Sequence, residues 1–164
     1  MVIARHPETG VYNASFNRCQ IVGGQHARLR MMAPQHLGQY QTAAEDRREP
    51  LPVAMVIGAP PALMLSAASK IPIDRNELQI AGAWQNSPLR VINALTVPLV
   101  VPADAEYVIE GEVVPNIREV EGPFGEFTDT YVEPAGNHVL RVPALTRRND
   151  ALHHSLLSGT PYDI

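Results

Sequence analysis

The sequence predicts an α+β domain around a barrel-like sheet, because several short strand patterns alternate with small helical ones. Turn residues support this: the 164 residues include 11 Gly and 15 Pro, many at turn-like intervals, which is typical of many short elements. Hydrophobic residues make up 45% and charged residues 18% of the chain. A packed core is therefore expected, and the length suits one domain over residues 1–164.

The first third of the chain is expected to form strands. The first strand begins almost at Met1, and residues 7–10 read as a turn, with Pro early and Gly last. Residues 11–22 are predicted to be one strand. Gly23-Gly24 is a hairpin signal, and residues 26–32 are predicted to be the returning strand.

Short helices and a buried strand follow. Residues 39–48 are rich in Ala, Glu and Arg and predict a helix that two prolines close. The apolar run 53–57 predicts a buried strand. Pro60-Pro61 opens a helix that runs through Ala67, since proline is favoured in a first turn. A further helix is expected to begin at about residues 76–78 and to run to Trp84.

The remaining elements are mostly strands. Residues 88–114 are expected to form two or three strands that Pro98 and Pro102 interrupt, and residues 121–126 a glycine-containing loop. The last predicted strands are 139–146 and 152–157.

Composition excludes several classes of protein. The formal net charge is −4, which does not suit a nucleic-acid or anionic-membrane partner. Cys19 is the only cysteine, so no internal disulfide is possible and a reducing compartment is expected. No apolar run approaches a membrane span, and the start lacks a signal-peptide pattern. We expect a cytoplasmic protein, and the abrupt ends suggest a segment of a longer one.

The most informative motif is Glu121-Gly-Pro-Phe-Gly-Glu126, in which two carboxylates flank a turn. The turn can bring both acids toward one pocket, where one carboxyl group takes up a raised pKa and can deliver a proton. The alternative, which spacing alone favours, is a solvated turn with two surface acids.

A second candidate is Asn13-Ala-Ser-Phe-Asn-Arg18. Because the spacing of Asn13 and Arg18 is odd, the two face opposite sides of an unbroken strand, and one site can use both only if the strand ends or bulges between them. The guanidinium of Arg18 suits a carboxylate or phosphate. The alternative is an edge-strand arginine facing water.

Possible metal ligands are more scattered. His36 follows the hairpin and Glu77 lies at a helix start, so each is a candidate ligand together with the Asn13 oxygen. The alternatives are a structural histidine and an acid that favours the helix dipole. His153-His154 is interpreted as structural. Phosphate-loop, dinucleotide, nucleophile-elbow and zinc-protease motifs are missing from the sequence.

Taken in order, these segments resemble the UbiD family of reversible decarboxylases that use prenylated FMN. The resemblance depends on Asn13-x-x-x-x-Arg18, Gln35-His36, Glu77 and above all the 121–126 motif. It covers essentially the whole chain but only the middle part of a typical family member. It implies a split β-barrel related to flavin reductases, with short helices packed on it.

The resemblance also implies a set of site residues. Asn13, His36 and Glu77 are expected to hold Mn²⁺ or Mg²⁺ against the cofactor phosphate, and K⁺ is expected near residues 66–69. Thr160 stands where the family often has a basic residue, which weakens phosphate binding or shifts it onto Arg30 and the metal. The residues expected to bind the cofactor are Asn13, Phe16, Asn17, Arg18, Arg30, Met31, Met32, Gln35, His36 and Glu77.

Arg18, Glu121 and Glu126 are the catalytic residues that the resemblance implies. Arg18 is expected to hold the substrate carboxylate, and Glu126 to donate the proton that replaces the lost CO2. The substrate is expected to be an aromatic, heteroaromatic or α,β-unsaturated acid, and a flavin prenyltransferase to supply the cofactor. A homo-oligomer is also expected. Two alternatives are a non-catalytic flavin-binding or assembly module and an FMN reductase-like oxidoreductase.

Overall fold

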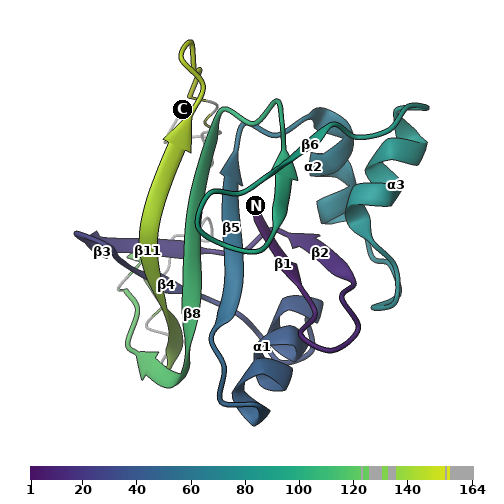
Figure 1. Cartoon of the computed structure of the whole chain (residues 1–164). Helices are drawn as coiled ribbons and strands as arrows, with labels where there is room; N and C mark the ends of the chain where they lie inside the picture. Colours follow the sequence, from purple (N-terminus) through teal and green to yellow (C-terminus); the bar gives the residue numbers. More distant parts are fainter. Residues whose placement is uncertain (123, 126–130, 133–135, 154, 156–164) are drawn as a thin grey trace.

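The computed structural model describes residues 1–122, 124–125, 131–132, 136–153 and 155. Within this part of the chain, the main feature is a seven-stranded antiparallel sheet with strand order β2-β1-β5-β8-β11-β4-β3 (Figure 1). Its strands are β1 (Val2–Arg5), β2 (Tyr12–Ser15), β3 (Cys19–Gly23), β4 (His26–Leu29), β5 (Leu51–Ile57), β8 (Tyr107–Glu119) and β11 (Asn137–Arg147). The other described elements are α1 (His36–Asp46), α2 (Pro61–Ala68), α3 (Glu77–Trp84), β6 (Val91–Asn93), β7 (Val100–Pro102), β9 (Phe124–Gly125) and β10 (Tyr131–Val132).

The sheet curls so that its two edges approach each other. β2 and β3 are the edge strands, yet Ser15 at the end of β2 is only four residues before Cys19 at the start of β3. Four residues of extended chain span at most about 14 Å, which is much less than the width of seven flat strands. The sheet therefore forms a split barrel, which confirms the predicted fold class.

Both faces of the central strands are covered. In β5, Val53 and Met55 belong to a core cluster that includes Leu37 and Tyr40 of α1, whereas Ala54 and Val56 pack in a second cluster with residues of α2 and α3. Burial on both faces explains why residues 53–57 read as a continuous apolar run instead of an alternating one. Figure 1 shows α1 apart from α2 and α3, which lie together.

Most predicted elements are present, with shifted ends. The helices at 61–68 and 77–84, the hairpin at Gly23-Gly24 and the strands at 51–57 and 137–147 are confirmed. Gly24 has a φ of 57°, a turn conformation that glycine adopts without strain. The 88–114 region holds β6, β7 and the first part of β8, and β8 continues to Glu119.

Four predictions need correction. The strand predicted over 11–22 is broken at 16–18, where the backbone N–H of Arg30 donates to the Arg18 carbonyl. The returning strand ends at Leu29. The helix predicted at 39–48 runs from His36 to Asp46. The 121–126 segment is not only loop, because Phe124–Gly125 pairs with Tyr131–Val132.

Half of the strand predicted at 152–157 lies outside the described residues, and its described residues 152, 153 and 155 are not in a strand. In the described part of the chain, no helix is long and apolar enough to cross a membrane.

Candidate functional site

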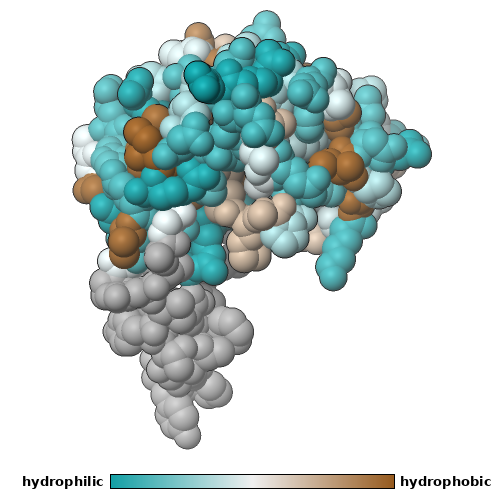
Figure 2. All heavy atoms as spheres, turned by 90° about the horizontal axis from the view of Figure 1, so that it is seen from below, coloured by the Kyte–Doolittle hydropathy of each residue, from teal (hydrophilic) through white to brown (hydrophobic). Residues whose placement is uncertain are grey.

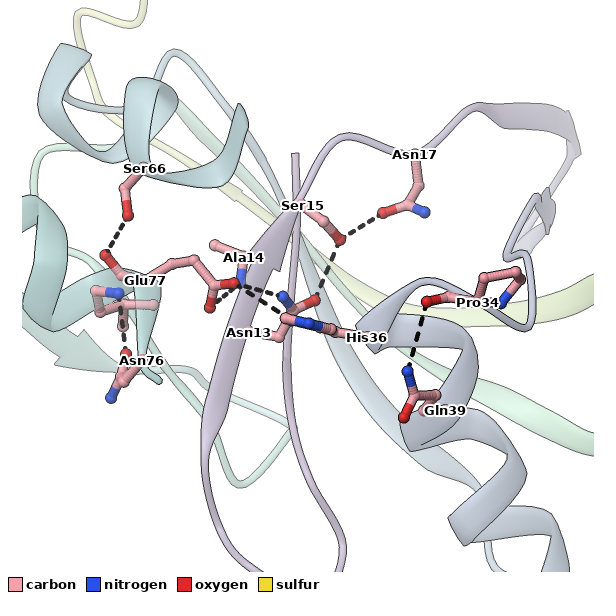
Figure 3. A network of polar contacts seen from close by, with 11 residues as sticks. Asn13, Ala14, Ser15, Asn17, Pro34, His36, Gln39, Ser66, Asn76 and Glu77 are labelled. Carbon is pink, nitrogen blue, oxygen red and sulfur yellow. Dashed lines mark hydrogen bonds and ion pairs between the residues drawn. The ribbon is translucent and has the colours of Figure 1, made fainter. Parts of the chain in front are cut away.

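Three elements bring Asn13, His36 and Glu77 together (Figure 3). Asn13 lies on β2, His36 is the first residue of α1, and Glu77 is the first residue of α3. The Asn76 side chain caps α3 by accepting from the backbone N–H of Leu78 at 2.9 Å, so the helix begins where Glu77 can turn toward β2. The predicted grouping of these three residues is therefore present, although their role remains a prediction.

Glu77 is the centre of this group. Its Oε1 accepts from Asn13 Nδ2 at 2.8 Å, and its Oε2 accepts from the backbone N–H of Ala14 at 3.2 Å. His36 Nδ1 lies 3.8 Å from Glu77 Oε1. Burial raises the pKa of Glu77, although these hydrogen bonds and the nearby His36 oppose the rise. A buried carboxylate of this kind is stabilised by a cation.

The donor set suits a divalent cation of the Mg²⁺ or Mn²⁺ type. A carboxylate, an imidazole and an amide oxygen are common ligands of such ions. The Asn13 amide presently turns its nitrogen toward Glu77, so metal binding requires this amide to rotate and present Oδ1. Among the described residues, no group of three or more His, Cys, Asp and Glu side chains could hold a metal ion, and this site has only His36 and Glu77 of those types.

A cleft of about 590 Å³ opens beside these residues. This volume is within the usual range for small-molecule and cofactor sites. The N-terminus of α1 faces the cleft through Gln35 and His36, and no side chain caps it. The lining residues are Asn13, Ala14, Ser15, Phe16, Pro34, Gln35, His36, Ala67, Ala68, Ser69, Lys70, Ile71 and Glu77.

Polar side chains link the cleft to the break between β2 and β3. Ser15 Oγ lies 3.2 Å from Asn13 Oδ1 and 2.8 Å from Asn17 Oδ1. Asn17 Nδ2 in turn donates to the Arg30 carbonyl at 3.2 Å. The odd spacing of Asn13 and Arg18 required such a break, and the break lets one segment serve both the cleft and the region around Arg18.

Arg18 contacts Glu121, 103 positions later in the chain. Arg18 Nη2 and Nε donate to Glu121 Oε2 at 2.7 and 3.1 Å, and the Asn137 side-chain amide donates to the same oxygen. Glu121 is 0% exposed. Cys19, next to Arg18, has its pKa raised to about 11 by burial and by the negative charge of Glu121, so its thiol stays protonated at neutral pH.

Not every predicted residue reaches these two regions. Phe16 and Gln35 line the cleft, but Met31 is buried in the core cluster of α1 and Met32 is an exposed side chain. Ser66 contacts the site through its hydroxyl, which donates to the Glu77 carbonyl at 2.7 Å. Glu126 and Thr160 lie outside the described residues.

Ser15, Ser66 and Asn137 are not among the catalytic, cofactor-binding and metal-binding residues that the sequence predicts. Ser15 sits inside a motif already recognised, and its position between two asparagines was a usable signal. Ser66 was placed only in a possible K⁺ region. Asn137 precedes a predicted strand and carries no pattern that relates it to residue 121.

Comparisons with known proteins agree with the fold. Residues 1–161 match the family model described as UbiD, the 3-octaprenyl-4-hydroxybenzoate carboxy-lyase Rift-related domain. Anhydromevalonate phosphate decarboxylase from Methanothermobacter thermautotrophicus is 36% identical over 157 residues, which cover 96% of this chain and 37% of that protein. Phenolic acid decarboxylase from Bacillus subtilis is 31% identical over 153 residues, with coverages of 93% and 32%.

A solved structure adds a similarity in three dimensions. The UbiD-class enzyme HmfF from Pelotomaculum thermopropionicum in complex with FMN has a TM-score of 0.88 and 39% identity, over 94% of this chain and 34% of that one. An evolved dimeric form of HmfF, in complex with prFMN, gives the same TM-score and identity, over 94% of this chain and 36% of that one. The chain thus spans about a third of the length of the proteins it matches.

Proposed function

Because the chain belongs to the UbiD carboxy-lyase family, we propose that it is the flavin-binding part of a reversible decarboxylase. The reaction is the non-oxidative loss of CO2 from an aromatic, heteroaromatic or α,β-unsaturated carboxylic acid. The names of the relatives support this class, since they include a phenolic acid decarboxylase and an anhydromevalonate phosphate decarboxylase.

The observation that carries the proposal is the ion pair of Arg18 and Glu121. Segments 103 positions apart place a guanidinium, 27% exposed, against a fully buried carboxylate at 2.7 Å. A buried carboxylate held by charge-assisted hydrogen bonds is costly to form and is common at sites that move protons. This pair also joins two of the four segments on which the family resemblance depends, the one that ends at Arg18 and the 121–126 motif.

The cleft beside Asn13 and Glu77 is the proposed cofactor site. Its volume of about 590 Å³ suits a flavin, and the uncapped N-terminus of α1 offers backbone N–H groups to a phosphate. Asn13, His36 and Glu77 would hold Mn²⁺ or Mg²⁺, with K⁺ near residues 66–69. Prenylated FMN, when bound, supplies the electron sink that decarboxylation needs.

In this proposal the protein orients the acid and handles the proton. Arg18 binds the substrate carboxylate in a charged hydrogen bond and holds Glu121. Glu126 donates the proton that replaces CO2, and removes one in the reverse carboxylation. A flavin prenyltransferase would supply the cofactor, and the dimeric form of HmfF supports the expectation of a homo-oligomer.

The test is Glu126→Gln in the chain loaded with prenylated FMN. We expect decarboxylation and solvent-deuterium exchange into the product to be lost, at least about 100-fold in rate, with flavin still bound. Glu8→Gln, a change to an exposed carboxylate, is the control and should retain activity. Unchanged solvent-deuterium exchange in Glu126→Gln would show that Glu126 is not the proton donor.

A second candidate function is a flavin-binding module without turnover of its own. The observation that favours it is that the chain spans only about a third of the length of its relatives. In that case the wild-type chain binds the flavin tightly, but no acid is decarboxylated and no deuterium is exchanged. The same assay therefore separates the two candidates before any variant is made.

A further inference from the structure

We propose that Asn137 is a positioning residue for Glu121, and that it leaves Oε1 of Glu121 as the carboxylate oxygen that can accept a hydrogen bond from a ligand. The inference rests on the proposed function, in which Glu121 is catalytic. Asn137 follows Glu121 by 16 positions and belongs to no motif that pointed to the activity.

All the described donors converge on one oxygen of Glu121. Arg18 Nε and Nη2 and Asn137 Nδ2 donate to Oε2. An arginine fork commonly meets a carboxylate with one N–H on each oxygen. Here both of these N–H groups go to the same atom, and the amide of Asn137, on β11, adds a third hydrogen bond.

The other oxygen is left without a partner. Among the residues that the structure describes, Oε1 of Glu121 is buried and accepts no hydrogen bond. A buried polar atom in this state is energetically costly and calls for an explanation. Because Oε2 already accepts three hydrogen bonds, a further donor from a ligand goes to Oε1.

Asn137 keeps the two oxygens distinct. It is the first residue of β11, pairs in register with Glu119 at the end of β8, and is only 4% exposed. Arg18 and Asn137 approach Oε2 from separate parts of the chain. Rotation of the carboxyl group would therefore break both contacts. Since a carboxylate only accepts, the Asn137 side chain must present its NH2 group, and an acid of the same shape cannot replace it.

The experiment compares Asn137→Ala with a matched control, Gln41→Ala, in the chain loaded with prenylated FMN. Gln41 is also a buried amide that donates to a carboxylate, Glu45 Oε1 at 2.9 Å, but it lies on α1 and its carboxylate partner is not Glu121. Measurements are kcat, KM, the dissociation constant of FMN, thermal unfolding, and a crystal structure of each variant.

We expect Asn137→Ala to lower kcat about 10- to 100-fold, as small misplacements of catalytic groups do. KM and the FMN dissociation constant should stay within about twofold, because Asn137 acts on Glu121 and not on binding. The crystal structure should show Glu121 turned from its wild-type orientation. Asn137→Asp should be slower still, since it places a second carboxylate against Oε2. Gln41→Ala should keep its kcat.

Three results would overturn the inference. They are an unchanged kcat in Asn137→Ala, an equal loss of kcat in Gln41→Ala, or an unmoved Glu121 in the crystal structure. If the wild-type chain decarboxylates no acid, the proposed function fails. The orientation of Glu121 in the crystal structures of the wild type and of Asn137→Ala still decides the role of Asn137.

Discussion

One carboxylate, that of Glu77, connects much of the candidate site. Its oxygens meet Asn13 and Ala14 of β2 and lie near His36 of α1, while its carbonyl accepts from Ser66 of α2 (Figure 3). A cation bound here therefore adds a contact between elements as well as a charge. Assembly of the cleft and occupation of the proposed metal site should therefore depend on each other.

We expect Glu77→Gln to abolish metal-dependent flavin binding. The substitution keeps the shape of the side chain but removes the only negative charge of the proposed ligand set, so FMN affinity with Mn²⁺ should fall at least about 10-fold. The measurement is quenching of FMN fluorescence with and without Mn²⁺. Glu49→Gln, at an exposed carboxylate, serves as the control. Equal FMN affinity of Glu77→Gln and the wild type would exclude Glu77 as a ligand.

At the scale of elements, the half-buried Glu45 holds α1 to β8. Its Oε1 accepts from Gln41, from the backbone N–H of Asn116 and from Arg118, and its Oε2 accepts from Arg118 at 3.0 Å. Burial alone would raise the pKa of Glu45, but the hydrogen bonds outweigh it and lower the pKa to about 2. The contact therefore joins α1 to β8 and contributes to the stability of the fold.

Glu45→Gln should destabilise the protein in a pH-dependent way. A carboxyl group whose pKa is lower in the folded state stabilises that state above its ordinary pKa of 4.5, and the contribution is lost as the pH falls toward 2. We expect a loss of about 1–2 kcal/mol in the free energy of unfolding at pH 7. Urea unfolding at several pH values measures it.

The control for this prediction is Asp46→Asn, the neighbouring exposed carboxylate on the same helix. It should change the stability by less than about 0.5 kcal/mol. A difference between wild type and Glu45→Gln that stayed constant from pH 7 to pH 2 would contradict a charge-dependent contact.

For the whole molecule, closure of the sheet is what assembles the site. The break at 16–18 joins the two edge strands, and it places Asn13 at the cleft and Arg18 beside Glu121. On the face drawn in Figure 2, hydrophobic residues gather in separate groups between hydrophilic ones. The buried hydrophobic residues, in contrast, form two clusters that pack against the sheet.

Ligand binding should stabilise the whole chain, because it favours the folded state only. With FMN and Mn²⁺ together at about 100 times the dissociation constant, we expect about 2.7 kcal/mol of added stability, or a rise of about 5–10 °C in Tm. Differential scanning fluorimetry measures the shift. A chelator should reverse it, and an equal shift from FMN alone would show that flavin binding does not use the metal.

Much of this protein follows from local sequence. The Asn76 cap, the Pro60-Pro61 helix start and the Gly23-Gly24 hairpin are decided by interactions between neighbouring residues, so the sequence alone determined the elements and the chemical types at the candidate site. The family resemblance then predicted that Asn13, His36 and Glu77 form one site. Their spacing in the sequence could not predict this.

Only the tertiary structure decided the contacts across the sheet. The start of α1 at His36, the burial of Met31 in the core, and the approach of Asn137 to Glu121 all depend on packing between segments far apart in the chain. Local patterns carry no information about such partners, because the burial and hydrogen bonding of each side chain are set by whichever element folds against it.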